Sequence, residues 1–229
     1  MGVMIMGSVV IGVAKMRKMR AEAANNPTPL QVDVERLLTS GEIAMCQQVF
    51  KNAIDYSKVR IVRGGLLGLT ALTGNAMTPE GFIHLPSNEY MNTPDFSIAL
   101  DAIDKHWFIH EMTHVWQYQL GTNAVWHGIN QLCKGGYTST VRTADTPKNG
   151  DLKAYATDLS GADAKKKFSE FNFEQQGRII EFWYDACYLQ KENPQRPHHQ
   201  RSLQLLIYVK QILVDFLQNP SDKNLLPKS

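Results

Sequence analysis

The sequence has few cysteines and no pattern among them. Only three occur in 229 residues, at positions 46, 133 and 187, and none forms a CxxC pair. An odd number of widely spaced cysteines argues against a disulfide framework and against a cysteine-rich zinc knuckle, although one disulfide with one remaining thiol stays open. Free thiols suit a protein that folds in a reducing compartment.

A marked excess of charge of either sign is also lacking. Lys and Arg number 24 against 22 Asp and Glu, so the formal net charge is +2. A dedicated nucleic-acid binder carries a basic stripe, so we expect no nucleic-acid partner. There is no internal repeat or low-complexity tract, and 43% hydrophobic with 20% charged residues is ordinary globular composition. The length fits one large domain with appendages.

The N-terminus lacks an apolar run long enough to cross a membrane. Residues 1–14 are almost wholly apolar, whereas a spanning helix needs about 20 such residues. The basic residues come after this run, between positions 15 and 20, whereas a signal peptide carries them before it. Three alternatives remain: a strand or helix packed onto the domain, a divergent export signal, or an interfacial anchor that contacts a membrane surface through residues 1–20.

The pattern along the rest of the chain predicts an α+β fold, mostly helical, with a small antiparallel sheet before the longest helix. We divide the chain into an apolar and basic extension (1–26), a central domain (27–192) and a C-terminal helical tail (193–229), with a linker at 25–29. A capping box of Thr39 and Glu42 begins the first helix. Apolar periodicity predicts helices at about 97–119, 173–190 and 203–217, strands at about 59–62 and 82–85, and a loop-rich stretch at 121–165.

An HExxH motif at residues 110–114 lies inside the second predicted helix. Positions four apart share one helix face, so His110 and His114 can bind one Zn²⁺ together. Glu111 points elsewhere and can act as general base on a water at the metal. The alternative is a pair of ordinary surface histidines beside a glutamate.

The sequence leaves the third zinc ligand open. Leu120 stands where the longer HExxHxxGxxH motif has its third histidine, so the ligand must come from farther along. Glu174 and Glu181 lie on one face of the 173–190 helix and are both candidates; the alternative is a solvated face of ion pairs. The residues that could support a ligand or stabilise an oxyanion are His106, Tyr137, Tyr155 and Asp185.

Residues 38–185 resemble a family of small zincin-like metallopeptidases, described as Vgr-related, from bacterial type VI secretion and related contractile injection systems. The matching segments include LTSGEIA at 38–44, HEMTHVWQ at 110–117 and FEQQ at 173–176. The resemblance implies a zincin-like fold, zinc on His110 and His114, and Glu111 as catalytic base. It ranks Glu174 first as third ligand, with Glu181 as the alternative.

These observations together predict a zinc metallopeptidase or amidase that cleaves an amide bond with Glu111 as general base. It would be a toxin-like type VI effector acting on protein or peptidoglycan, with a secretion-system or immunity protein as partner. It would be made in the bacterial cytoplasm and then secreted, injected or held at a membrane by its N-terminus. The alternative is a non-catalytic zincin-like module that binds a component of a secretion apparatus.

Overall fold

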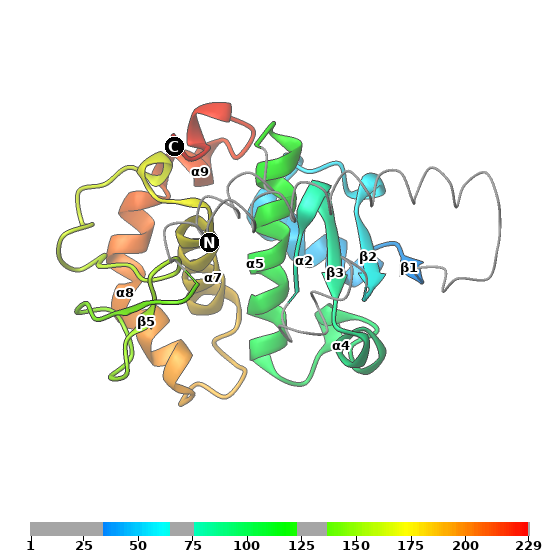
Figure 1. The fold of residues 1–229 in the computed structure, drawn as a ribbon, viewed down its shortest axis with the longest axis horizontal. Helices are drawn as coiled ribbons and strands as arrows, with labels where there is room; N and C mark the ends of the chain where they lie inside the picture. Colours follow the sequence, from blue (N-terminus) through cyan, green and yellow to red (C-terminus); the bar gives the residue numbers. More distant parts are fainter. Residues whose placement is uncertain (1–33, 65–75, 123–136, 229) are drawn as a thin grey trace, which may run out of the picture.

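The computed structural model describes residues 34–64, 76–122 and 137–228 (Figure 1). The expectations for the N-terminal extension and for the linker at 25–29 lie outside these residues and stay predictions. No helix of the described part is both long and apolar enough to cross a membrane. The strands are β1 (Glu35–Arg36), β2 (Arg60–Arg63), β3 (Phe82–Leu85), β4 (Thr140–Val141) and β5 (Asp151–Leu152).

The α-helices are α2 (Ser40–Phe50), α4 (Ser87–Asn92), α5 (Ala102–Gln119), α7 (Phe173–Tyr188), α8 (Pro197–Ile212) and α9 (Val214–Gln218). Short 3₁₀ helices lie at η1 (Tyr56–Lys58), η3 (Pro79–Gly81), η4 (Phe96–Ile98), η5 (Phe168–Glu170) and η6 (Lys223–Leu225). Figure 1 shows α5 between the β1–β2–β3 sheet on one side and α7 on the other, with α8 beyond α7. The α+β class is therefore confirmed, and the helix that carries HExxH is covered on both sides.

The first helix begins as predicted at the capping box. The Thr39 hydroxyl accepts a hydrogen bond from the Glu42 backbone N–H at 3.1 Å, and the Glu42 carboxylate accepts one from the Thr39 N–H at 2.9 Å. The fully buried Glu42 carboxylate also accepts two hydrogen bonds from Arg36 and one from the Phe96 backbone. One side chain therefore joins β1, α2 and η4.

The prediction of an antiparallel sheet is only partly right. β1 and β2 pair antiparallel, but β2 and β3 pair parallel, with Arg60 opposite Phe82 and Arg63 opposite Leu85. A hairpin would need a short turn, whereas residues 64–81 separate the two strands and allow a crossover. The stretch expected to be loop-rich also contains a two-stranded sheet, β4 and β5, whose two-residue strands are too short to show alternation.

Two helix boundaries differ from the prediction. The helix expected from about residue 97 begins at Ala102, because Asp101 caps α5 at the Ile103 N–H while Asp95 caps the separate turn η4. The C-terminal helix expected at 203–217 is two helices, and the first already begins at Pro197. Proline is favourable in a first helical turn, where its missing N–H would have no partner.

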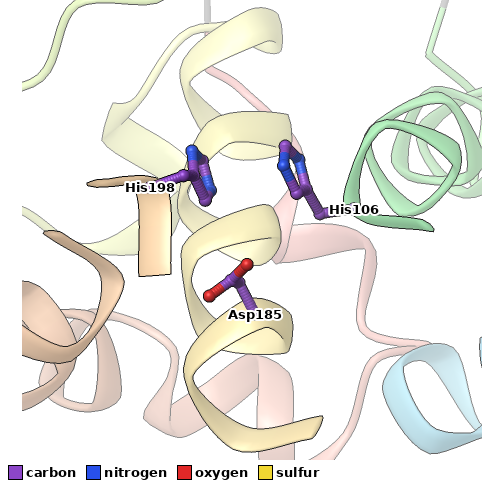
Figure 2. Close-up of side chains that lie close together, drawn as sticks. All are labelled: His106, Asp185 and His198. Atoms are coloured by element: carbon purple, nitrogen blue, oxygen red, sulfur yellow. The ribbon is translucent and has the colours of Figure 1, made fainter. Parts of the chain in front are cut away.

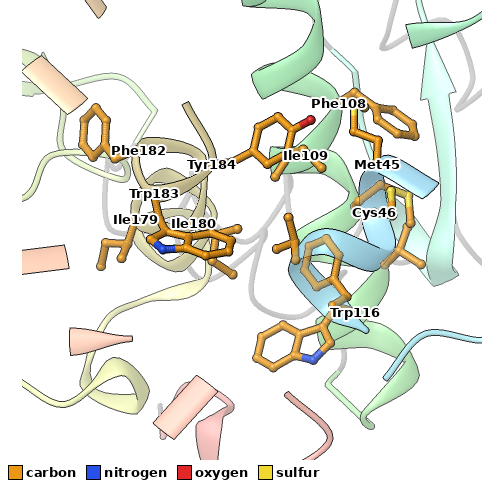
Figure 3. Packing of buried hydrophobic residues seen from close by; sticks show 14 of the residues in the cluster. Met45, Cys46, Phe108, Ile109, Trp116, Ile179, Ile180, Phe182, Trp183 and Tyr184 are labelled. Carbon is orange, nitrogen blue, oxygen red and sulfur yellow. The ribbon is translucent and has the colours of Figure 1, made fainter. Parts of the chain in front are cut away.

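The core brings α2, α5 and α7 together (Figure 3). Met45 and Cys46 of α2 and the fully buried Trp116 of α5 belong to one apolar cluster. The predicted C-terminal tail contributes to this cluster through Phe216 and Leu225, and the Trp116 indole N–H donates to the Pro220 carbonyl at 2.7 Å. The tail therefore packs on the same core as the helix that carries HExxH.

Candidate metal centre

The two histidines of HExxH meet a carboxylate from α7. The Nε2 atom of His110 lies 3.1 Å from Glu174 Oε2, and the Nε2 atom of His114 lies 3.2 Å from the same oxygen. One ligand atom from each of the three buried residues lies within 4.8 Å of the others. Two imidazole nitrogens and one carboxylate oxygen form a set that Zn²⁺ uses in catalytic sites, so these residues fit a metal ion.

The other nitrogen of each imidazole has its own acceptor. His110 Nδ1 lies 3.1 Å from Glu181 Oε2, and His114 Nδ1 lies 2.9 Å from Gln117 Oε1. Both of these oxygens only accept hydrogen bonds, so each Nδ1 donates, and each Nε2 can bind an ion once any proton that it shares with Glu174 has left. Glu181, the alternative ligand, thus contacts His110 at the nitrogen that faces away from Glu174.

Two glutamines connect His114 by hydrogen bonds to residues near the end of the chain. The amide of Gln117 donates to the Phe173 carbonyl at 3.1 Å and to Gln176 Oε1 at 2.9 Å. The amide of Gln176 donates in turn to the carbonyls of Phe168 at 2.9 Å and Leu225 at 2.8 Å. The sequence analysis assigned no role to either glutamine, although both belong to the HEMTHVWQ and FEQQ segments.

A glycine lets the two helices approach at the site. A Cβ atom added at Gly177 would lie 2.6 Å from Cε1 and 2.8 Å from Nδ1 of His110, far inside normal contact distance. Gly177 follows Glu174 by one helical turn and so lies on the face that meets α5. Glycine in a helix interior is unfavourable and therefore often marks a close approach, which was the only sequence signal for this contact.

Glu111, the acidic residue of HExxH, is also buried and is held by a hydrogen bond. Glu111 Oε2 accepts a hydrogen bond of 2.6 Å from the hydroxyl of Thr78, which precedes η3. The hydroxyl of Tyr137 donates to Glu174 Oε1 at 2.6 Å, and the ring of Tyr155 lies 6.0 Å from that of Tyr137. One carboxylate that could act as a base and two phenols thus lie around the candidate ligands.

The two carboxylates of α7 are held ionised despite their burial. Burial alone would raise the pKa of Glu174, but the charge of His114 and the hydrogen bonds from His110 and His114 hold it well below its usual range. For Glu181, burial is outweighed in the same way by Arg178 and by contacts with His106 and His110. A pair of buried anions beside two imidazoles is favourable for a cation.

The two carboxylates also shift the pKa values of a histidine and two tyrosines beside them. Burial would lower the pKa of His110, but its hydrogen bonds to Glu174 and Glu181 raise it to about 10. Burial raises the pKa of Tyr137 and of Tyr155, and the charge of Glu174 raises both further. Both phenols are therefore neutral near pH 7 and can donate a hydrogen bond.

Two of the predicted supporting residues lie in a separate group. His106 stacks on His198, and Asp185 accepts hydrogen bonds from Arg196 and, at 2.6 Å, from Nδ1 of His199. Figure 2 shows His106, Asp185 and His198 gathered around α7. Glu181 connects the two groups, because its Oε1 lies 3.3 Å from His106 Nδ1 while its Oε2 contacts His110.

Comparison with known proteins finds similarity to a spike protein of a type VI secretion system. The sequence is 33% identical over 150 residues to the type VI secretion system spike protein VgrG2b of Pseudomonas aeruginosa PAO1. This match covers 65% of the chain but only 13% of that much longer protein. No protein-family model matches the sequence.

A solved structure extends the similarity to most of the chain. The effector domain of P. aeruginosa VgrG2b superimposes with a TM-score of 0.55 and 26% sequence identity, over 88% of this chain and 98% of that domain. The chain is thus homologous to VgrG2b through its effector domain, in agreement with the predicted resemblance to Vgr-related proteins.

Proposed function

We propose that this protein is a type VI secretion effector that hydrolyses amide bonds with one zinc ion held by His110, His114 and Glu174. The observation that supports this most is the convergence of both Nε2 atoms on a single Glu174 oxygen. Three protein ligands leave the fourth position of a tetrahedral zinc free, as hydrolysis requires. The effector role is supported by homology to VgrG2b, which is named as a type VI spike protein.

The protein groups around this centre have separate roles. When bound, zinc supplies a Lewis acid that polarises the substrate carbonyl and lowers the pKa of water toward about 7. Glu111 takes the proton of the attacking water and returns it to the leaving amine, while the Thr78 hydroxyl orients its carboxylate. The neutral phenol of Tyr155 would stabilise negative charge on the carbonyl oxygen, whereas the hydroxyl of Tyr137 donates to Glu174, the proposed ligand.

The proposed substrate is an amide bond in protein or in the peptide cross-links of peptidoglycan. Made in the bacterial cytoplasm, the effector would be injected through the secretion apparatus, and an immunity protein would protect the producing cell. Membrane contact through residues 1–20 remains a separate prediction.

Cleavage assays on the full chain with zinc test this proposal. The substrates are an unfolded protein and purified peptidoglycan sacculi, and mass spectrometry identifies the new ends. Glu111→Gln is expected to keep its zinc and lose activity by roughly 10²–10⁴-fold, because the proton transfer is lost. Glu35→Gln, at an exposed position of β1, is the matched control and should retain activity.

A Glu111→Gln variant as active as the wild type would contradict the hydrolytic mechanism. Zinc held by four protein ligands, with neither substrate cleaved, would instead favour the second candidate, a binding module of the secretion apparatus.

A further inference from the structure

A second cluster of metal-ligand side chains lies one helical turn from the candidate centre. His106 of α5, Asp185 of α7 and His198 of α8 point toward one another (Figure 2), and one ligand atom from each lies within 4.8 Å of the others. The two imidazole rings are stacked, with centroids 4.1 Å apart and planes at 6°, so one ring must turn before both nitrogens can point at one ion. Three helices thus contribute one ligand residue each.

Ring nitrogens of this cluster lack hydrogen-bond partners. The side chain of His106 is only 9% exposed, yet neither of its ring nitrogens makes a hydrogen bond within the part of the chain that the structure describes. The same holds for the buried Nε2 atom of His198. A buried polar atom without a hydrogen bond costs free energy, and an ion bound at these nitrogens would offset that cost.

Carboxylate oxygens lie at the distances that a metal site requires. Glu181 Oε1 lies 3.3 Å from His106 Nδ1 and 3.6 Å from His198 Nε2. Ligands at about 2.0–2.1 Å from a tetrahedral ion lie roughly 3.4 Å from one another, so both distances fit. Asp185 lies within 4.8 Å of the ring nitrogens, and its Oδ1 already accepts a hydrogen bond from His199, so it must approach more closely to complete such a tetrahedron.

Two arginines contact these carboxylates without excluding an ion. The Arg178 guanidinium lies 3.0 Å from Glu181 Oε1, and Arg196 contacts Asp185 Oδ2. A carboxylate has about four lone-pair directions, so each can accept from an arginine and still bind a cation. The arginines therefore lower the net negative charge of the site but leave ligand positions available.

We propose that His106, His198 and Asp185, together with Glu181 Oε1, bind a second divalent ion of the first transition series, distinct from the ion at His110 and His114. Imidazole with carboxylate suits zinc, iron or nickel rather than calcium or magnesium. The side chain of His198 is 20% exposed, which provides a route for the ion.

The number of zinc ions bound per chain tests this site. The metal-free full chain is titrated with Zn²⁺ alone, and bound zinc is measured by calorimetry and elemental analysis. His198→Phe keeps an aromatic ring between His106 and Phe182 but removes the ligand nitrogen. Gln204→Phe, at an exposed position of the same helix, is the matched control.

His198→Phe is expected to bind one ion fewer than both the wild type and the control. Equal numbers in all three proteins would overturn the proposal. Because the result is a difference, it does not depend on the proposed catalytic ion: if His110 and His114 bind nothing, the wild type still binds one ion and His198→Phe binds none.

Crystals of the full chain soaked in zinc give a readout that needs no variant. Anomalous scattering at the zinc edge should show a peak at about 2.0–2.1 Å from a nitrogen of His106 and one of His198. Diffraction without a peak between these rings would overturn the proposal, whatever is found at His110.

Discussion

The imidazole of His110 occupies the space that any side chain at position 177 would need. A Cβ atom at Gly177 would lie 2.6 Å from the ring, a distance that real contacts essentially never show. The helix that carries HExxH and the helix that carries Glu174 can therefore meet at this point only if α7 has a glycine here. The placement of Glu174 against both Nε2 atoms depends on this approach.

Gly177→Ala is expected to destabilise the metal-free protein and to weaken zinc binding, since α5 or the ring must shift. The same substitution in a His110→Ala background should instead stabilise the protein by up to about 1 kcal/mol, because alanine favours a helix and the clash is gone. Urea unfolding of the four proteins measures both effects. An equal change in both backgrounds would contradict the steric explanation.

Substitution of the two glutamates on α7 should separate their roles. At the site of His110 and His114, Glu174→Gln is expected to lower zinc affinity by more than about 100-fold, because a ligand is lost, whereas Glu181→Gln, which there only weakens the partner of His110, should cost roughly 10–100-fold. Competition with a chromophoric chelator measures both affinities. A larger loss of zinc affinity in Glu181→Gln would make Glu181 the ligand and Glu174 the supporting residue.

Tyr155→Phe tests the proposed oxyanion donor. Its ring lies 5.8 Å from that of His110 and its hydroxyl is neutral near pH 7, so its loss should lower kcat by roughly 10²–10³-fold without changing zinc content. Tyr188→Phe, at an exposed position of α7, is the control. Unchanged kcat in Tyr155→Phe would assign the residue to packing alone.

The stability of the metal-free protein should rise with pH between about 4 and 6.5. Burial lowers the pKa of His198 to about 4 in the folded state, whereas an unfolded histidine titrates near 6.5. Between these values the unfolded chain binds more protons, so folding is penalised as the pH falls. Denaturation in EDTA across this range should show a shallower slope for His198→Phe, and identical slopes would contradict this assignment.

The sequence alone predicts which residue types form the site better than it predicts how the helices bring them together. The spacing of His110 and His114 is local, so one helix suffices to place both rings on the same face. Glu174 and Glu181 lie on one face of α7, two turns apart. Which of them meets Nε2 depends on how α7 packs on α5, and periodicity holds no information about helix packing.

Long-range contacts limit what the sequence predicts about the fold. The capping box of Thr39 and Glu42 is local and is confirmed, whereas the parallel pairing of β2 with β3 joins strands that are 18 residues apart in the sequence. The grouping of His106 with His198 likewise requires α8 to fold back onto α7, which no motif indicates.

The hydrogen bonds that run from His114 through Gln117 and Gln176 to the Leu225 carbonyl make the geometry of the candidate centre depend on a part of the chain that holds no ligand. During translation, a ribosome completes HExxH and Glu174 well before it adds Leu225. A nascent chain therefore carries His110, His114 and Glu174 before His114 is fully oriented, so the candidate centre would be complete only after the segment around Leu225 has packed.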